Sequence, residues 1–165
     1  MMREICLDYQ AALPVDPLVT EAMKPYFSDK YGNPSSIHSL SIEPKEALED
    51  SREKVARLIG VSKKDEVIFT SGGTESNNLA IKGIAFRNRE KGNHIITSSI
   101  EHMSVLNPCK YLMKFGFEVT FLPVDPYGIV DLEALKKAVR KETILVSIIY
   151  ANGELGTVQP IREIG

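Results

Sequence analysis

The chain has 165 residues, of which 43% are hydrophobic and 25% charged, and its formal net charge is −2. This length is enough for one compact domain with a core. The near-neutral charge excludes a general attraction to nucleic acid or to anionic membranes. No segment approaches the roughly 18 apolar residues of a transmembrane helix, and no signal-peptide pattern is present. The two cysteines, Cys6 and Cys109, are too few for a disulfide framework or a zinc cluster, and we expect no metal site. We expect both to be buried as small hydrophobic residues. The expected compartment is the cytoplasm.

The first third of the chain predicts two helices separated by a long loop. Residues 16–27 suit a helix that Asp16 can cap. Residues 43–59 predict the clearest helix, with Ser41 as its cap and Gly60 as its stop. The stretch SDKYGNPSSIHSL between them is rich in Gly, Asn, Pro and Ser, which indicates a loop. A loop of this length in a compact domain is usually functional.

Strands and helices alternate through the rest of the chain. The segments EVIFT, HIITSS, FEVTFLPV and TILVSIIYA predict strands, and the last is apolar and long enough to be central and buried on both faces. Helices are expected at 75–90, 102–115 and 131–140, and Pro108 should make the second one start late or kink. Such alternation predicts right-handed crossovers and a mostly parallel sheet, which is an α/β fold with three αβα layers.

The end of the sequence resembles the first turn of a further helix. A parallel sheet without its last crossover would have an uncovered edge or face, so we expect a piece of a longer protein. The alternative is a naturally short chain with a disordered tail. We expect an N-terminal segment (1–15), a part with the first helices and the GNPSS loop (16–60) and an incomplete large domain (61–165).

Three polar segments directly follow predicted strands. They are residues 70–74, 98–102 and 152–154. Ligands of open α/β sheets bind beyond the carboxyl ends of the strands. These three segments could therefore converge on one cleft.

The segment TSGGT, residues 70–74, is a candidate anion site. The dipole and unpaired N–H groups of a helix start favour a phosphate. Gly72 and Gly73 would allow close approach of the backbone, and the hydroxyls of Ser71 and Thr74 could add hydrogen bonds. The alternative is a glycine turn with Thr74 as an ordinary helix cap. No Lys follows the glycines, which argues against a P-loop. The segment is not G-x-G-x-x-G either, which argues against a dinucleotide-binding fingerprint.

The three histidines have different expected roles. His102 opens a predicted helix, where its imidazole could stack on a flat ring or donate a hydrogen bond. The alternative for His102 is a helix cap or a surface residue. His94 lies at the entrance of a predicted strand and is expected to be structural, whereas the sequence leaves the role of His38 open.

Five segments along the chain form an ordered set of motifs. They are LDYQAALPVDP, YGNPSSIHSL, VIFTSGGTESNNLAIKG, HIITSSIEHMSVL and TILVSIIYANGELGTVQPI. They are similar to L-D-x-x-A-T-T-P, G-N-P-S-S-x-H, F-T-S-G-A-T-E-x-x-N, T-x-x-E-H-x-x-V and V-S-x-x-x-x-N-N-E-x-G-x-x-Q-x-I. In this order they resemble the NifS/IscS-type cysteine desulfurases, which are class V aminotransferase-like transferases of fold type I that use pyridoxal 5′-phosphate (PLP). The resemblance covers the whole chain and implies the N-terminal part of the large domain of a PLP transferase.

The resemblance also implies site residues and a reaction. It places the PLP phosphate on Gly73 and Thr74, stacks His102 on the pyridine ring as a catalytic residue that assists proton transfer, and puts Asn152 beside the ring. The implied reaction converts L-cysteine to L-alanine and leaves a persulfide on the enzyme. The sulfur would pass to an iron–sulfur scaffold or to tRNA-thiolation partners. Family members are homodimers, so a homo-oligomer or a complementary C-terminal chain is implied, without binding of nucleic acid or membrane.

The sequence departs from the family pattern in several places. The family's Schiff-base Lys, the Asp that faces the pyridine nitrogen and the persulfide Cys lie beyond the last matched segment, so we expect the isolated chain to be inactive. Gly153 replaces the second Asn of the Asn-Asn pair, Tyr150 stands where His is common, and Ala12-Leu13 replaces Thr-Thr. Two alternatives stay open: a non-catalytic truncated or split subunit that binds or scaffolds, and another class V relative such as a selenocysteine lyase or an aminotransferase.

Overall fold

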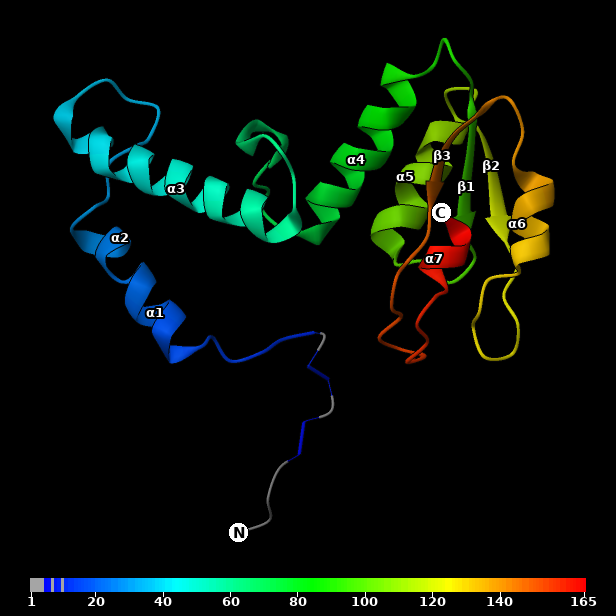
Figure 1. The fold of residues 1–165 in the computed structure, drawn as a ribbon, viewed down its shortest axis with the longest axis horizontal. Helices are drawn as coiled ribbons and strands as arrows, with labels where there is room; N and C mark the ends of the chain where they lie inside the picture. Colours follow the sequence, from blue (N-terminus) through cyan, green and yellow to red (C-terminus); the bar gives the residue numbers. More distant parts are fainter. Residues whose placement is uncertain (1–4, 7, 10) are drawn as a thin grey trace. The chain divides into compact units, whose positions relative to one another are not determined.

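The computed structural model describes residues 5–6, 8–9 and 11–165. Parts of the predicted segment 1–15 and of the motif LDYQAALPVDP therefore lie outside the described residues. Internal contacts divide the chain into one unit that ends at Phe69 and one that runs from Thr70 to Gly165. Figure 1 labels the elements of both units. Among the residues described, no helix has the length and apolar character needed to cross a membrane.

The first unit is helical. Its elements are α1 (Pro17–Met23), α2 (Pro25–Ser28), the 3₁₀ turn η1 (Ser39–Ser41), α3 (Ile42–Ile59) and the 3₁₀ turn η2 (Lys64–Glu66). Asp16 caps α1 as predicted, because its carboxylate accepts a 2.7 Å hydrogen bond from the N–H of Leu18. The single helix predicted at 16–27 is divided at Lys24, because Pro25 has no N–H with which to continue the helical hydrogen bonds.

Helix α3 confirms the clearest helix of the sequence, but its start differs from the prediction. Ser41 stands at the cap position without a capping hydrogen bond. Its single hydroxyl proton is shared instead between the carbonyls of Ser36 and His38, so Ser41 occupies the predicted cap position but its side chain does not cap the helix. Gly60 ends the helix as predicted, with the left-handed φ of 72° that favours glycine.

The second unit is built on a three-stranded sheet. Its elements are α4 (Gly73–Arg87), β1 (His94–Ser98), α5 (Met103–Met113), β2 (Glu118–Leu122), α6 (Leu132–Ala138), β3 (Thr143–Ser147) and α7 (Ile161–Ile164). The strand order is β2-β1-β3 and both pairs are parallel, which confirms the predicted parallel sheet. The central strand is β1, whose five residues are all buried. The expectation that TILVSIIYA is central and buried on both faces is wrong, since β3 pairs only with β1 among the described strands and Val146 is 38% exposed.

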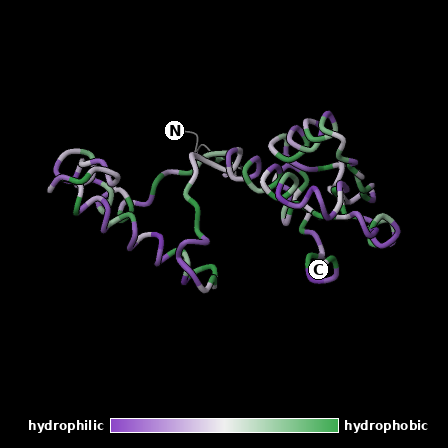
Figure 2. Tube along the Cα trace, turned by 90° about the horizontal axis from the view of Figure 1, so that it is seen from above, coloured by the Kyte–Doolittle hydropathy of each residue, from purple (hydrophilic) through white to green (hydrophobic). Residues whose placement is uncertain are grey.

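Alternate residues of β1 face two separate hydrophobic clusters. Ile95 belongs to a cluster with α4 and α5, whereas Ile96 belongs to a cluster with α6. This alternation is the two-residue period of a strand. Hydrophobic residues occur in both units (Figure 2), and Figure 1 shows α4 and α5 on one side of the strands with α6 on the other. The three αβα layers predicted from the sequence are therefore present.

One local prediction fails because it ignored non-local contacts. Residues 67–70 are irregular instead of forming the predicted EVIFT strand, since no strand in the described part of the chain pairs with them. Ile68 is accordingly 64% exposed. Helix α5 begins at Met103 and contains Pro108, so of the two expected effects of the proline, a late start or a kink, the late start does not occur.

His94 is the structural histidine that the sequence predicts. It is 2% exposed at the start of β1, and its ring nitrogens lie 2.8 Å from the hydroxyls of Thr143 and Thr120. These two threonines belong to β3 and β2, so one ring joins all three strands. Burial lowers the pKa of His94, the Arg140 cation adds to this effect, and Glu118 and Glu142 oppose it.

We expect the second unit to lose stability as the pH falls below about 6.5, the ordinary pKa of histidine. The pKa of His94 is lower in the folded chain, so the unfolded chain takes up this proton first and the free energy of unfolding decreases. His94→Gln should remove this component, because an amide can bond both hydroxyls but does not titrate. Urea denaturation of both proteins between pH 7.5 and 5.0 measures the difference. The same pH dependence in both proteins would contradict the assignment.

Candidate functional site

The starts of α4 and α5 lie at one end of the sheet. Figure 1 shows both helix starts at the end toward which the strand arrows point. Thr74 from α4 and His102 from the segment before α5 line one hollow of about 460 Å³. Its lining residues are Thr74, Asn78, Lys82, His102, Met103, Ser104, Asn107, Pro108 and Tyr111. Two of the three polar segments predicted to converge are therefore brought together.

The third predicted segment is fixed beside the second. The amide of Asn152 donates to the carbonyl of Ile100 at 3.0 Å. Its oxygen accepts from the N–H groups of Glu154 and Leu155 at 2.9 Å each. Asn152 is not among the residues that line the hollow with Thr74 and His102. Its side chain holds the 152–155 turn against the loop that carries His102.

The start of α4 offers backbone donors in open space. Gly72 is the cap residue and gives no side-chain hydrogen bond to the first turn, so Thr74 is the second helical residue and the alternative of Thr74 as the cap is wrong. The first N–H groups of an α-helix have no partner within the helix. A Cβ built on Gly72 or Gly73 would meet no atom within 4 Å. The backbone of both glycines is therefore open on the side where a side chain would stand, which allows an anion to approach the helix start closely.

The hydroxyl of Ser71 is already used within the protein. Its hydroxyl and N–H donate to one carboxylate oxygen of Glu75 at 2.7 and 2.6 Å. These two hydrogen bonds lower the pKa of Glu75. The Ser71 hydroxyl therefore holds the helix start in shape, and the donors near Gly73 that remain for an anion are backbone N–H groups and the Thr74 hydroxyl.

His102 is the cap of α5, which agrees with the simpler of its two sequence interpretations. Its Nδ1 accepts from the N–H of Ser104 at 3.1 Å and lies 2.7 Å from the hydroxyl of Ser104. An Nδ1 that accepts a backbone N–H carries no proton, so the neutral ring holds its proton on Nε2. The same ring lines the hollow beside Thr74, so capping and contact with a ligand are compatible.

Glu101, directly before His102, is a buried carboxyl group. It is 7% exposed and accepts from the hydroxyl of Ser98 at 2.7 Å and from the N–H of Ile149 at 2.6 Å. Burial raises the pKa of Glu101, and the hydrogen bonds from Ser98 and Ile149 partly oppose this. Reasoning from the residues gave Glu101 no role, although its place beside His102 was a usable signal. It joins the end of β1 to the segment that follows β3.

The two cysteines lie in different environments. Cys109 is buried in α5 as predicted, and burial raises the pKa of its thiol to about 11. Such a thiol is a poor nucleophile, because the reactive form is the thiolate. Cys6 is exposed, so the expectation that it is buried is wrong. It lies before α1, where the described side chains are all exposed. No group of three or more potential metal ligands occurs among the residues described.

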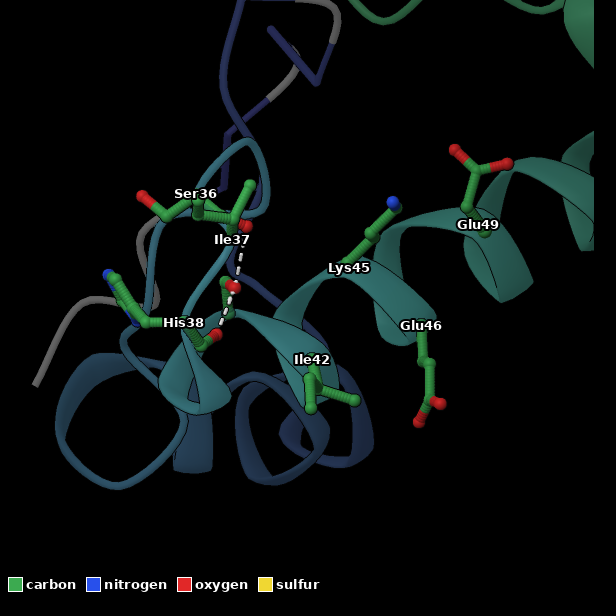
Figure 3. Close-up of a pocket in the computed structure, with 8 residues that line it drawn as sticks. Ser36, Ile37, His38, Ile42, Lys45, Glu46 and Glu49 are labelled. Carbon is green, nitrogen blue, oxygen red and sulfur yellow. Dashed lines mark hydrogen bonds between the residues drawn. The ribbon is translucent and has the colours of Figure 1, made fainter.

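The first unit has a separate hollow of about 540 Å³ between the GNPSS loop and α3. The residues that line it are Ser36, Ile37, His38, Ser41, Ile42, Lys45, Glu46 and Glu49 (Figure 3). His38, whose role the sequence leaves open, lies on the loop side. Glu49 forms ion pairs with Lys64 at 2.8 Å and Arg52 at 3.4 Å, which lower the pKa of its carboxyl group. The negative charge of Glu49 in this hollow is therefore already paired with the cations of Lys64 and Arg52.

Comparison with known proteins identifies the family. Residues 5–165 match the family model described as aminotransferase class-V. The chain is 58% identical to the cysteine desulfurase IscS of Dictyoglomus turgidum over 99% of this chain and 41% of that protein. Among solved structures, a NifS-like protein has a TM-score of 0.89 and 44% identity over 96% of this chain and 44% of its own. SspA in complex with cysteine has a TM-score of 0.87 and 45% identity over 96% of this chain and 45% of its own.

The match is thus continuous along this chain but spans only part of each relative. The chain covers 41% of the length of the curated desulfurase and 44% of that of the NifS-like structure. The sequence motifs, the parallel sheet with its flanking helices and the family model all agree. The chain belongs to the aminotransferase class-V family.

Proposed function

We propose that this chain forms the phosphate-holding part of a PLP-dependent cysteine desulfurase, which converts L-cysteine to L-alanine and enzyme-bound persulfide sulfur. The observation that carries the proposal is the start of α4, where open backbone at Gly72 and Gly73 adjoins a hollow shared by Thr74 and His102. The relatives named cysteine desulfurase support the reaction class. A solved relative in complex with cysteine supports L-cysteine as substrate.

The residues at the start of α4 fit the phosphate of PLP. A phosphate dianion is stabilised by the partial positive charge and N–H groups of a helix start. The N–H groups of Gly73 and Thr74 and the hydroxyl of Thr74 would bind it. His102 would lie against the pyridine ring, and Asn152 would hold the neighbouring turn. When bound, PLP supplies an electron sink for cleavage of bonds at the substrate α-carbon and β-carbon.

The chain's own residues contribute orientation and one hydrogen-bond donor. With Nδ1 used as an acceptor, the neutral His102 ring carries an N–H at Nε2, which can donate a hydrogen bond to a group in the hollow. Glu101 fixes the loop before His102 through its bonds to Ser98 and Ile149. The anion-binding end and this imidazole therefore belong to two helix starts that one sheet holds side by side.

The remaining chemistry requires residues outside this sequence. Cys109 is buried with a pKa raised to about 11, which is unsuited to a sulfur-accepting thiolate. Cys6 lies in an exposed irregular segment and does not match the family's persulfide position. We infer that the Schiff-base Lys and the persulfide Cys come from the same longer chain or from a complementary one. A homodimer and an iron–sulfur or tRNA-thiolation sulfur acceptor belong to the same proposal.

A binding experiment tests the phosphate site. The chain should bind PLP in equilibrium dialysis, and pyridoxal, which lacks the phosphate, should bind at least about tenfold more weakly. Thr74→Val removes one hydroxyl donor without changing the side-chain shape and should weaken PLP binding about tenfold, as expected for a hydrogen bond to a charged group. Thr20→Val, in exposed α1, serves as the control. Equal binding of PLP and pyridoxal, or an unchanged affinity in Thr74→Val, would refute the site.

The second candidate is a non-catalytic subunit that retains the phosphate site. Gly153 favours it, because glycine lacks the amide that the family's second Asn presents. Mixing with the complementary C-terminal part of a class V relative distinguishes the two. The desulfurase proposal expects alanine to form from L-cysteine in the mixture, whereas a scaffold would bind the partner without forming alanine.

A further inference from the structure

One polar contact joins α4 to α5 directly beside the candidate site. The amide nitrogen of Asn77 lies 2.8 Å from the hydroxyl of Ser104, and this hydroxyl lies 2.7 Å from Nδ1 of His102. Ser104 is 6% exposed, so the contact is shielded from water. Asn77 follows Thr74 by one helical turn, and Ser104 lies in the first turn of α5. The ring of His102 is thus connected through two side chains to the helix that carries Thr74.

The direction of the hydrogen bond between His102 and Ser104 follows from the two neighbouring bonds. The amide nitrogen of Asn77 can only donate, so Ser104 accepts from it. Nδ1 of His102 accepts the N–H of Ser104 and therefore has no proton to give. The single hydroxyl proton of Ser104 must then point to Nδ1. The order of donation is Asn77 to Ser104 to His102, and Nδ1 receives two hydrogen bonds.

This arrangement has a chemical consequence for the imidazole. A proton on Nδ1 would break the hydrogen bond from the N–H of Ser104 and would force the Ser104 hydroxyl to turn its own proton away from the ring. The ring therefore keeps its proton on Nε2, and any proton exchange with a ligand takes place at that atom. The plane of the ring is also fixed, because the N–H and the hydroxyl of Ser104 hold the same nitrogen.

We propose that Asn77 and Ser104 are positioning residues that set the tautomer and the orientation of His102 relative to the start of α4. Neither residue needs to touch cofactor or substrate for this purpose. The use of the oriented ring against PLP rests on the proposed function. The hydrogen-bond chain itself involves protein atoms alone.

The test measures the tautomer of His102 in the chain without cofactor. Long-range ¹H–¹⁵N NMR at pH 9, well above the ordinary pKa of histidine, separates Nε2–H from Nδ1–H, and His102→Gln identifies the signals. Wild type should show almost entirely Nε2–H. Ser104→Ala should lower the Nε2–H to Nδ1–H ratio about fivefold, which corresponds to one lost hydrogen bond. Asn77→Ala should lower it in the same direction by less, because the hydroxyl then loses only its orientation.

Two further variants separate positioning from general destabilisation. Ser104→Thr keeps a hydroxyl and should restore the wild-type ratio. Asn88→Ala removes the amide of the residue that caps the C-terminal end of α4 and donates to the carbonyl of Ile84, and it should leave the ratio unchanged. A wild-type ratio in folded Ser104→Ala, or an equal change in Asn88→Ala, would overturn the proposal. Failure of PLP to bind in dialysis would refute the proposed function and leave this tautomer result intact.

Discussion

Replacing Glu101 with alanine should lower the free energy of unfolding of the second unit by about 2–4 kcal/mol. The carboxylate accepts from the partly buried N–H of Ile149 and from the hydroxyl of Ser98. Alanine would leave a backbone donor without a partner where water has little access, and each such group costs about 1–3 kcal/mol. Urea denaturation gives the total change. Hydrogen exchange at the Ile149 amide should accelerate in particular, because that N–H loses its acceptor.

Glu101→Gln is the matched control, because it keeps an oxygen acceptor and removes the charge. We expect it to stay within about 1 kcal/mol of wild type, since the neutral side chain avoids the cost of burying a carboxylate. Burial raises the pKa of Glu101, so the folded chain holds this proton more tightly than the unfolded chain. The stability of wild type relative to Glu101→Gln should therefore decrease as the pH rises from about 4.5 through the raised pKa. Equal losses in the alanine and glutamine variants would show that the oxygen acceptor is unimportant.

Replacing Gly92 with alanine should destabilise the second unit by about 3 kcal/mol. A Cβ on Gly92 would lie 2.2 Å from the carbonyl oxygen of Glu142 and 2.7 Å from its carbon. That carbonyl cannot retreat without cost, because it accepts from the N–H of His94 at 3.0 Å, where β1 and β3 begin to pair. The added methyl group must therefore separate the two strands at their start.

Gly116→Ala provides the comparison for Gly92→Ala in the same unit. Gly116 has a φ of 83°, and its nearest neighbour to an added Cβ is the end of the Arg89 side chain at 4.0 Å. The free energy of unfolding should fall there by only about 1–2 kcal/mol, which is the cost of holding an alanine in the left-handed conformation. Urea denaturation of both variants measures the two losses. A smaller loss for Gly92→Ala than for Gly116→Ala would mean that the approach of Gly92 to Glu142 is not a constraint.

Elements with strong local signals could be predicted from the sequence. Asp131 caps α6 as its position indicates, with bonds of 2.9 and 3.0 Å to the N–H groups of Glu133 and Ala134. Gly60 and Asp16 likewise end and begin helices through contacts within a few residues. Strand pairing decides two other features, which are the irregular conformation of residues 67–70 and the central place of β1. A local sequence pattern does not show which strands pair.

Some features of the candidate site could likewise be predicted from the sequence, and others depend on contacts between distant residues. The positions of Thr74 and His102 after apolar segments were foreseeable, because the carboxyl ends of parallel strands meet at one edge of the sheet. The hydrogen bond between Asn77 and Ser104 was not, since it joins residues 27 positions apart through the packing of α4 against α5. Similarly, the use of the Ser71 hydroxyl by Glu75 became visible only once the turn before α4 was in place.

The cap of α5 is an imidazole, and this links helix stability to ligand binding. A conventional Ser or Asp cap serves only its helix, whereas His102 serves the helix and faces the hollow with the same ring. By thermodynamic reciprocity, a ligand that prefers the capped ring must stabilise the first turn of α5 by the same free energy with which that turn favours the ligand. Order at this helix start and occupancy of the site are therefore two readouts of one equilibrium.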